Sequence, residues 1–289
     1  MVVNAKKPVS IPTTSAIERP PVDPERRLTH VAHGPVTYTD EGEGSVILLI
    51  HGLPGSVRDY RYLAPHLDAY RRIRVDLPGF GGTSRQGRTI WSLEQRAALL
   101  VGVLDELRVP RVVAVGHSMG GPIALALATL APERVIGLGL LASPGLVPHR
   151  GFVRSRVPLL SRLMRLPGAP LLLARPLRRG FIAAGFSRNM TADAMTSAII
   201  DAGALTFDAH ATRLRRVQLP TLIASADDDH LVESAIAEGL DGTCGAGPRL
   251  RWQTGGHNIQ KTRAVEIATA LNPFVAQCFA SCLAQGKAR

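Results

Sequence analysis

The residue best suited to chemistry in this sequence is Ser118, at the centre of Gly116-His117-Ser118-Met119-Gly120. Gly-x-Ser-x-Gly is typical of a sharp turn between a strand and a helix, which exposes the serine hydroxyl above the edge of a sheet. Side chains two positions before or after Ser118 would collide with the returning chain, so glycine meets a steric need at both places. The free N–H groups and positive dipole end of the following helix would face the hydroxyl. The pattern predicts a nucleophilic serine where negative charge is stabilised.

The segments on either side of this turn agree with that prediction. Val112–Val115 is a run of small apolar residues expected to form a buried strand, and Pro122–Leu130 is an apolar run expected to form a helix. Gly-x-Ser-x-Gly alone is short enough to occur by chance in a chain with 28 glycines. The flanking strand and helix supply the context that the motif requires.

A serine hydroxyl is a weak nucleophile near neutral pH and needs a general base. His257 follows the last expected strand, Arg249–Gln253, in a loop whose two glycines let the imidazole reach back over the sheet. We therefore expect His257 to be the base. His51 and His117 belong to turn motifs and suit structural roles. The remaining histidines have no supporting pattern: His30, His33, His66, His149, His210 and His230.

The third group needed is a carboxylate that orients the imidazole and stabilises the imidazolium. Three adjacent candidates, Asp227, Asp228 and Asp229, follow an expected strand at Pro220–Ser225. The residues by themselves leave the choice among the three open. Any of them gives the chain order serine, aspartate, histidine.

The elements that must position these groups alternate between strands and helices. A hairpin is expected over residues 28–38, strands over 46–50, 72–75 and 135–141, and helices over 59–67 and 92–107. The strands are continuous apolar runs, as in a parallel sheet that is buried on both faces. The first 27 residues hold five prolines and almost no periodic pattern, and we expect a flexible leader there.

Three motifs in this order resemble the α/β-hydrolase fold superfamily, in its serine-nucleophile branch with a helical cap. They are His51-Gly52-Leu53-Pro54-Gly55, Asp76-Leu77-Pro78-Gly79-Phe80-Gly81-Gly82-Thr83-Ser84 and Gly116-His117-Ser118-Met119-Gly120-Gly121. The resemblance covers about residues 28–284. It implies an α/β fold with a mostly parallel, doubly wound sheet, formed by residues 28–144 and 217–289. A helical cap, residues 145–216, would be inserted over the site.

The resemblance also implies roles for individual residues. The family commonly has Gly-x-x-Asp-x-x-Val after this strand, and aligning Val232 with that valine selects Asp229. Ala226 stands where glycine is usual, so Asp227 and Asp228 stay open as alternatives. His257 matches the family's Gly-His. The oxyanion hole would be formed by the backbone N–H groups of Leu53 and Met119.

The implied activity is that of a serine hydrolase that cleaves an ester or similar acyl bond of a small, fairly apolar molecule through an acyl-enzyme. No cofactor and no metal is expected. Carbon–carbon bond hydrolases and cofactor-free haloperoxidases of this fold use the same triad, and lipases and carboxylesterases are not separated by sequence. A non-catalytic small-molecule receptor is the alternative from another class. Ser118 argues against the haloalkane dehalogenase and epoxide hydrolase branches, which need an aspartate nucleophile.

The net charge of +11 comes mostly from arginine, dense over residues 150–188. It could attract acidic substrates, anionic lipid or nucleic acid, but we favour a solvated basic surface, with peripheral membrane contact through the cap as a minor alternative. No nucleic-acid-binding motif accompanies the charge. The three cysteines show no disulfide or metal spacing. Neither a signal peptide nor a transmembrane segment is evident, so a cytoplasmic location is expected. The oligomeric state is left open.

Overall fold

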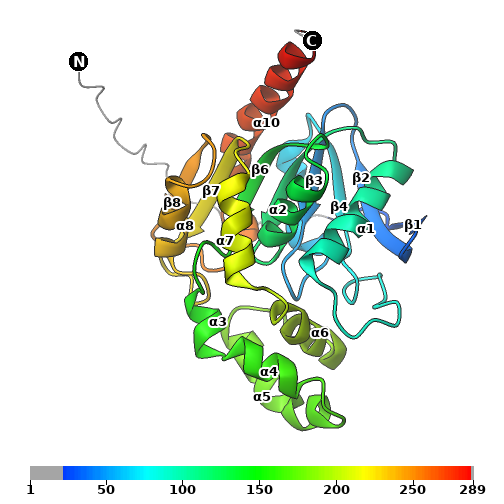
Figure 1. Cartoon of the computed structure of the whole chain (residues 1–289), viewed down its shortest axis with the longest axis vertical. Coiled ribbons are helices and arrows are strands. Elements are labelled where there is room, and N and C mark those ends of the chain that lie inside the picture. Colours follow the sequence, from blue (N-terminus) through cyan, green and yellow to red (C-terminus); the bar gives the residue numbers. More distant parts are fainter. Residues whose placement is uncertain (1–21, 288–289) are drawn as a thin grey trace.

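A sheet of eight strands runs through residues 22–287, the part of the chain that this computed structural model describes (Figure 1). The predicted leader, residues 1–27, lies almost wholly outside the described residues. The strands are β1 (Arg27–Val31), β2 (Gly34–Glu41), β3 (Val46–Ile50), β4 (Arg71–Val75), β5 (Val112–His117), β6 (Val135–Leu141), β7 (Thr221–Ala226) and β8 (Arg249–Trp252). Their order in the sheet is β1-β2-β4-β3-β5-β6-β7-β8. The first two strands form the predicted hairpin and pair antiparallel, while β3 to β8 pair parallel.

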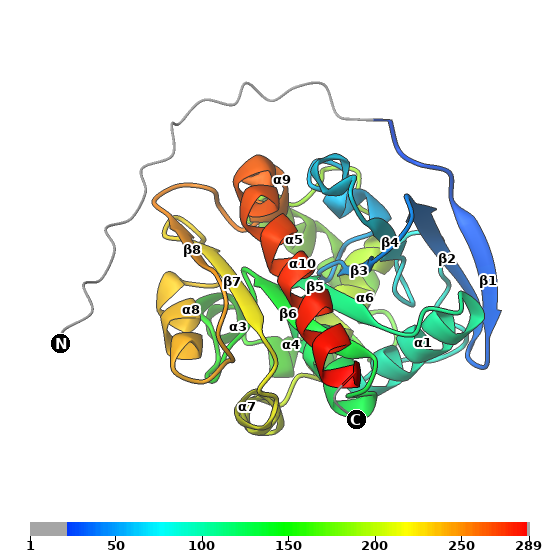
Figure 2. The ribbon, with the colours of Figure 1, turned by 90° about the horizontal axis from the view of Figure 1, so that it is seen from above.

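Helices cover both faces of the sheet (Figure 2). The helices are α1 (Leu93–Glu106), α2 (Gly120–Leu130), α3 (Arg150–Arg154), α4 (Val157–Leu163), α5 (Ala169–Ala183), α6 (Ala192–Ala202), α7 (Phe207–Arg216), α8 (Ser234–Asp241), α9 (Ile259–Thr262) and α10 (Ala264–Lys287). Two short 3-10 helices, η1 (Val57–Tyr60) and η2 (Ala64–Leu67), stand where one helix was expected. Residues 61–63, which include no glycine, separate the two short helices, and Pro65 lies in the first turn of η2.

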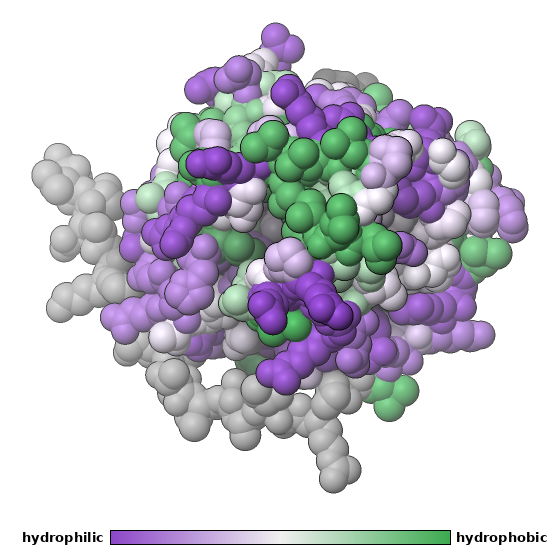
Figure 3. All heavy atoms as spheres, turned by 90° about the horizontal axis from the view of Figure 1, so that it is seen from below, coloured by the Kyte–Doolittle hydropathy of each residue, from purple (hydrophilic) through white to green (hydrophobic). Residues whose placement is uncertain are grey.

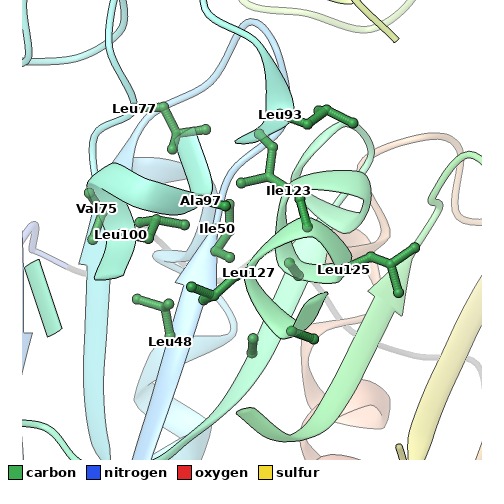
Figure 4. Packing of buried hydrophobic residues seen from close by; sticks show 14 of the residues in the cluster. Leu48, Ile50, Val75, Leu77, Leu93, Ala97, Leu100, Ile123, Leu125 and Leu127 are labelled. Atoms are coloured by element: carbon green, nitrogen blue, oxygen red, sulfur yellow. The ribbon is translucent and has the colours of Figure 1, made fainter. Parts of the chain in front are cut away.

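The core follows from the two-residue period of the strands. Leu48 and Ile50 of β3 point to one face, where they pack with α1 and α2 (Figure 4). Ile47 and Leu49 point to the other face and pack with α10. All four side chains are essentially inaccessible to solvent. Burial on both faces explains why the strand is a continuous apolar run rather than an alternating one.

The parallel arrangement gathers the chemically important residues at one edge. Because parallel strands all end at the same side of a sheet, the loops after β3, β5, β7 and β8 meet there. These loops carry Leu53, Ser118, Asp229 and His257 in turn.

Five helices, α3 to α7, are inserted between β6 and β7. Four of them, α3 to α6, stand beyond the edge of the sheet where the site lies (Figure 1). In contrast, α7 runs along the side of the sheet, where it packs against α2 and buries Leu214 in the main core. The predicted cap, residues 145–216, thus includes a last helix that packs on the sheet and not over its edge.

Helix α10 is the one helix in residues 22–287 that is long and apolar enough to cross a membrane, by length and composition. Ile267, Leu271 and Val275 on its inner face are fully buried against the sheet. One third of its apolar window, Ala264–Ala284, is buried in this way. The helix therefore serves here as part of the core.

Candidate active site

Ser118 sits in a backbone conformation that few side chains adopt. It follows β5 directly, and its φ of 51° lies in the left-handed region. Such a conformation costs on the order of 1–3 kcal/mol and persists only where the surroundings enforce it. A hydrogen bond of 2.8 Å from the Ser118 N–H to the Leu141 carbonyl helps to hold the turn. A half-buried serine in a strained turn at the end of a strand is the geometry that the sequence pattern predicted.

The glycines of the turn are required by space. A Cβ at Gly116 would lie 2.2 Å from the carbonyl carbon of Gly120. A Cβ at Gly120 would lie 2.1 Å from the carbonyl oxygen of Ile50. Both distances are far below van der Waals contact, so neither position tolerates a side chain. The steric reason given from the sequence holds for both glycines.

The structure brings Ser118, Asp229 and His257 together in one hydrogen-bonded chain. The His257 Nδ1 lies 2.8 Å from an Asp229 carboxylate oxygen, and its Nε2 lies 2.9 Å from the Ser118 hydroxyl oxygen. A carboxylate only accepts, so the proton is on Nδ1 and Nε2 is free to accept the serine proton. Ser118 lies more than a hundred positions before Asp229 and His257, which are 28 positions apart, and the arrangement of the three side chains suits proton abstraction from the serine.

The surroundings of Asp229 favour its ionised form although the side chain is buried. Burial by itself would raise the pKa of this carboxyl. The hydrogen bond and charge of His257, together with the N–H groups of Val232 and Leu231, outweigh burial and lower the pKa below its usual range. A carboxylate that accepts several N–H groups is typical of this balance. The Ala226 side chain causes no conflict in the turn, because it lies against Gly255, which has no Cβ.

The two neighbouring acids have other partners. Asp227 is half exposed and pairs with Arg251, whose Nε lies 2.6 Å from its carboxylate. Asp228 accepts the N–H of Gly256 at 2.7 Å, which helps to fix the loop that carries His257. Neither hydrogen-bonds to the imidazole, so the alternatives left open by the sequence are separated by geometry.

Leu53 and Met119 line the same cavity as Ser118, and each carries a backbone N–H. Neither donates a hydrogen bond to any described residue. His51 fixes the loop that holds Leu53: its Nδ1–H donates to the Gly52 carbonyl at 2.6 Å and its Nε2 accepts from the Leu77 N–H at 3.0 Å. Two unused donors beside a nucleophile can stabilise an oxyanion.

The side chain of His117, the residue before Ser118, contacts the backbone of His257. Its Nε2 lies 2.8 Å from the carbonyl oxygen of His257, so this nitrogen carries a proton and donates it. Burial lowers the pKa of His117 to about 3, which keeps the ring neutral. A structural role was expected for His117, but its contact with His257 was not. No signal in the sequence joins residues 140 positions apart.

A cavity of about 400 Å³ opens above Ser118 and His257. Its walls are mainly apolar and come from the inserted helices, with no charged side chain among the lining residues. The cap contributes Phe152, Val157, Leu160, Leu173, Pro176, Leu177, Phe181, Phe186, Ala198 and Ile199. The size falls in the usual range for small-molecule sites.

Besides Ser118 and His257, the polar side chains that line the cavity are those of His149 and Ser155. The Nδ1 of His149 lies 2.8 Å from the Leu231 carbonyl oxygen and must therefore donate. The Phe152 N–H also lies 3.3 Å from this nitrogen, but a protonated Nδ1 cannot accept it, and we regard the shorter contact as the real one. Nε2 is then left as a hydrogen-bond acceptor. The sequence had given no reason to select His149.

No cluster of three or more histidine, cysteine, aspartate or glutamate side chains in residues 22–287 could hold a metal ion. The cysteines of this region, Cys244, Cys278 and Cys282, are free thiols.

Comparison with known proteins agrees with this architecture. The sequence model of the alpha/beta hydrolase fold family matches residues 45–175. Two bacterial relatives are an uncharacterized hydrolase, YugF, of Bacillus subtilis (35% identical over 128 residues, 43% of this chain and 46% of the relative) and the 2-hydroxy-6-oxo-2,4-heptadienoate hydrolase of Pseudomonas putida (39% over 110 residues, 37% and 40%). These alignments thus span less than half of either relative.

The fold itself extends over nearly the whole chain. The crystal structure of haloalkane dehalogenase DbeA from Bradyrhizobium elkani superposes with a TM-score of 0.71, covering 90% of this chain and all of that one at 20% identity. The topology and these matches define the α/β-hydrolase fold. The predicted fold class is thus confirmed.

Proposed function

We propose that this protein is a serine hydrolase that cleaves an ester or similar acyl bond of a small, largely apolar molecule. The observation that supports this most strongly is the hydrogen-bonded chain of Asp229, His257 and Ser118, which opens into an uncharged cavity beside two unused backbone donors. The two relatives described above are named as hydrolases, but their alignments cover only part of each protein. The reaction type therefore rests on the chemistry of the site.

The proposed reaction proceeds in two halves. His257 Nε2 takes the proton from the Ser118 hydroxyl as its oxygen attacks the acyl carbon. The N–H groups of Leu53 and Met119 hold the oxyanion, and Asp229 stabilises the imidazolium. His257 then gives the proton to the leaving alkoxide, and the alcohol departs. Water, activated by the same histidine, hydrolyses the acyl-enzyme and restores Ser118.

Hydrolysis of a carbon–carbon bond is the second candidate, favoured by the Pseudomonas putida relative, which is named for a heptadienoate. That substrate carries a carboxylate, and a buried carboxylate needs a counter-charge or several donors. No arginine or lysine lines the cavity in the described part of the chain. We therefore rank the uncharged acyl substrate first.

Three further alternatives receive less support. Halide displacement on this fold needs a carboxylate nucleophile, where Ser118 stands here. A cofactor-free haloperoxidase would use the same three residues and is separated by an assay with peroxide and halide. A receptor without activity would not need the base to be hydrogen-bonded to the serine, as His257 is. We also propose a cytoplasmic location, a small acyl substrate as the partner in catalysis, and no cofactor.

Active-site labelling tests the proposal directly. A fluorophosphonate probe should label the wild type and should fail to label the Ser118→Ala and His257→Ala variants. Wild-type turnover should be measured with a series of acyl esters of increasing chain length, because the cavity of about 400 Å³ limits the acyl group. Labelling that survives Ser118→Ala would refute the assignment of the nucleophile. A folded wild type with neither labelling nor turnover would favour the receptor.

The acid has a matched control two positions away. Asp229→Asn should lower kcat by about 10⁴, because the asparagine amide would favour the wrong histidine tautomer. Asp227→Asn removes a carboxylate from the same loop but loses only an exposed contact with Arg251, and it should leave kcat within about twofold. Equal losses in both variants would contradict the role of Asp229.

A further inference from the structure

The outer part of the insertion concentrates positive charge. Residues 150–190 include nine arginines and no lysine, aspartate or glutamate. Every arginine–carboxylate pair in the described part of the chain uses an arginine from outside this segment. Arg162, Arg175 and Arg179 are exposed. The charge is therefore available to an anionic partner.

Large apolar side chains are exposed on the same segment of the chain. They are Val153, Leu159, Leu163, Leu166, Leu171 and Leu172, with exposed fractions from 40% for Leu163 to 83% for Leu171. Figure 3 shows this end of the molecule, where apolar side chains gather and hydrophilic ones flank them. Half of the twelve large exposed hydrophobic side chains in the described residues lie here. A contiguous apolar patch of this kind marks an interaction surface.

The inner and outer sides of α5 differ in what they contact. Leu173, Leu177 and Phe181 line the cavity above Ser118, whereas Leu171 and Leu172 face outward. No residue of α5 is fully buried, although the helix is 15 residues long. One helix therefore separates the cavity from the exposed face.

We propose that this face, formed by the exposed leucines, Val153 and arginines of α3 to α5, docks on the surface of an anionic lipid bilayer. Leucine inserted at the level of the headgroups and arginine paired with lipid phosphates are the two contributions that hold amphipathic helices at a membrane. A nucleic acid would pair with the arginines but would leave the leucines in water. From the sequence we favoured a basic surface that is merely solvated. The structure adds that leucines are exposed beside the arginines, and a merely solvated surface does not account for them.

The proposal predicts binding to vesicles that depends on lipid charge and on both residue types. Wild-type protein should sediment with vesicles of phosphatidylcholine and phosphatidylglycerol at physiological salt, and only weakly with phosphatidylcholine alone. The triple variant Arg162→Gln, Arg175→Gln, Arg179→Gln should bind on the order of 100-fold more weakly. The double variant Leu171→Ser, Leu172→Ser should bind at least about tenfold more weakly.

Matched controls lie at the opposite end of the molecule. Arg111, Arg215 and Arg216 are exposed and unpaired with carboxylates in the described residues, and Leu130 is 53% exposed. Replacing these arginines by glutamine, or Leu130 by serine, should leave vesicle binding within about twofold. All these variants should hydrolyse a soluble ester at the wild-type rate, and Ser118→Ala should bind vesicles normally. Docking is thereby tested separately from catalysis.

Specific results would overturn the proposal. Equal sedimentation with neutral and anionic vesicles, or none with either, would do so. So would full binding by the leucine double variant, since that leaves electrostatics alone. Strong binding of duplex DNA that is lost in the arginine variant and unchanged in the leucine variant would identify a polyanion site instead.

Discussion

At the residue scale, the proposed nucleophile, Ser118, and the proposed base, His257, follow from local constraints. Gly116 has no room for a side chain because Gly120 lies against it, and Gly120 has none because Ile50 of the neighbouring strand does. The need for glycine at these two places makes the motif around Ser118 visible in the sequence. His257 is recognisable because two glycines precede it in the loop after the last strand. The acid is different. Three adjacent aspartates have the same local pattern, and only contacts with residues far along the chain separate Asp229 from the others.

The contact between His117 and the His257 carbonyl leads to a prediction. His117→Phe keeps a ring of similar size but removes the donor, so the loop that carries His257 loses a buried hydrogen bond. We expect kcat to fall about tenfold with KM nearly unchanged, because His117 positions the base and does not line the cavity. His117→Gln, which keeps a donor, should recover part of the loss. Steady-state kinetics with a soluble ester measures both.

A control distinguishes positioning from general destabilisation. His210 is equally buried, and its Nε2 lies 3.3 Å from the carbonyl oxygen of Pro144, away from Ser118. His210→Phe should lower stability without a comparable change in kcat. If His117→Phe has a wild-type kcat, the positioning role assigned to His117 is wrong.

At the scale of elements, α6 is attached to the body of the protein through Asp201. This carboxylate is completely buried and accepts hydrogen bonds from the guanidinium groups of Arg85 and Arg96 and from the Trp91 N–H. Burial lowers the pKa of Arg96 to about 10, so Arg96 stays charged at neutral pH. The partners are separated by more than 100 residues, and no motif connects them. Sequence therefore indicated that helices are inserted but not how they are fastened.

Replacing Asp201 measures how much this attachment contributes to the free energy of unfolding. Asp201→Asn leaves Arg96 buried without a counter-charge, and we expect the free energy of unfolding to fall by about 3–5 kcal/mol. Glu94→Gln breaks the pair between Glu94 on α1 and Arg213 on α7, which is more exposed, and should cost less than about 1 kcal/mol. Urea denaturation of both variants measures the difference. Equal and small losses would show that Asp201 is not a main anchor.

At the scale of the whole molecule, buried histidines make the fold sensitive to acid. Burial lowers the pKa of His117 to about 3 and that of His210 to about 4, and it also lowers the pKa of His51. An unfolded chain takes up protons at these residues as the pH falls below 6.5, whereas the folded chain does not. The contribution of these histidines to the free energy of unfolding is therefore fully present above pH 6.5 and is lost as the pH falls from 6.5 to about 4. Asp59, whose pKa burial raises to about 7, opposes this with one proton.

The net slope should be positive, because burial also lowers the pKa of His149, so four histidines act against one carboxyl. We expect the free energy of unfolding to increase with pH between 4.5 and 6.5, with about 1.4 kcal/mol per pH unit for each net proton. His210→Gln should reduce that slope by up to one proton. Urea titrations at several pH values measure it. A flat or falling profile over this interval would contradict the assignment of neutral, buried histidines.

The separate attachment of the inserted helices has a consequence for how this protein can diversify. The insertion leaves the sheet at β6 and returns, through α7, to the adjacent strand β7, while Ser118, Asp229 and His257 stand on loops of the sheet itself. Substrate walls and reacting atoms thus belong to different stretches of the gene. We expect that exchanging α3 to α6 for those of a relative, with Asp201 retained, would change the substrate selectivity and leave the loops that carry Ser118, Asp229 and His257 unchanged. Evolution can explore new substrates on this scaffold without rebuilding its chemistry.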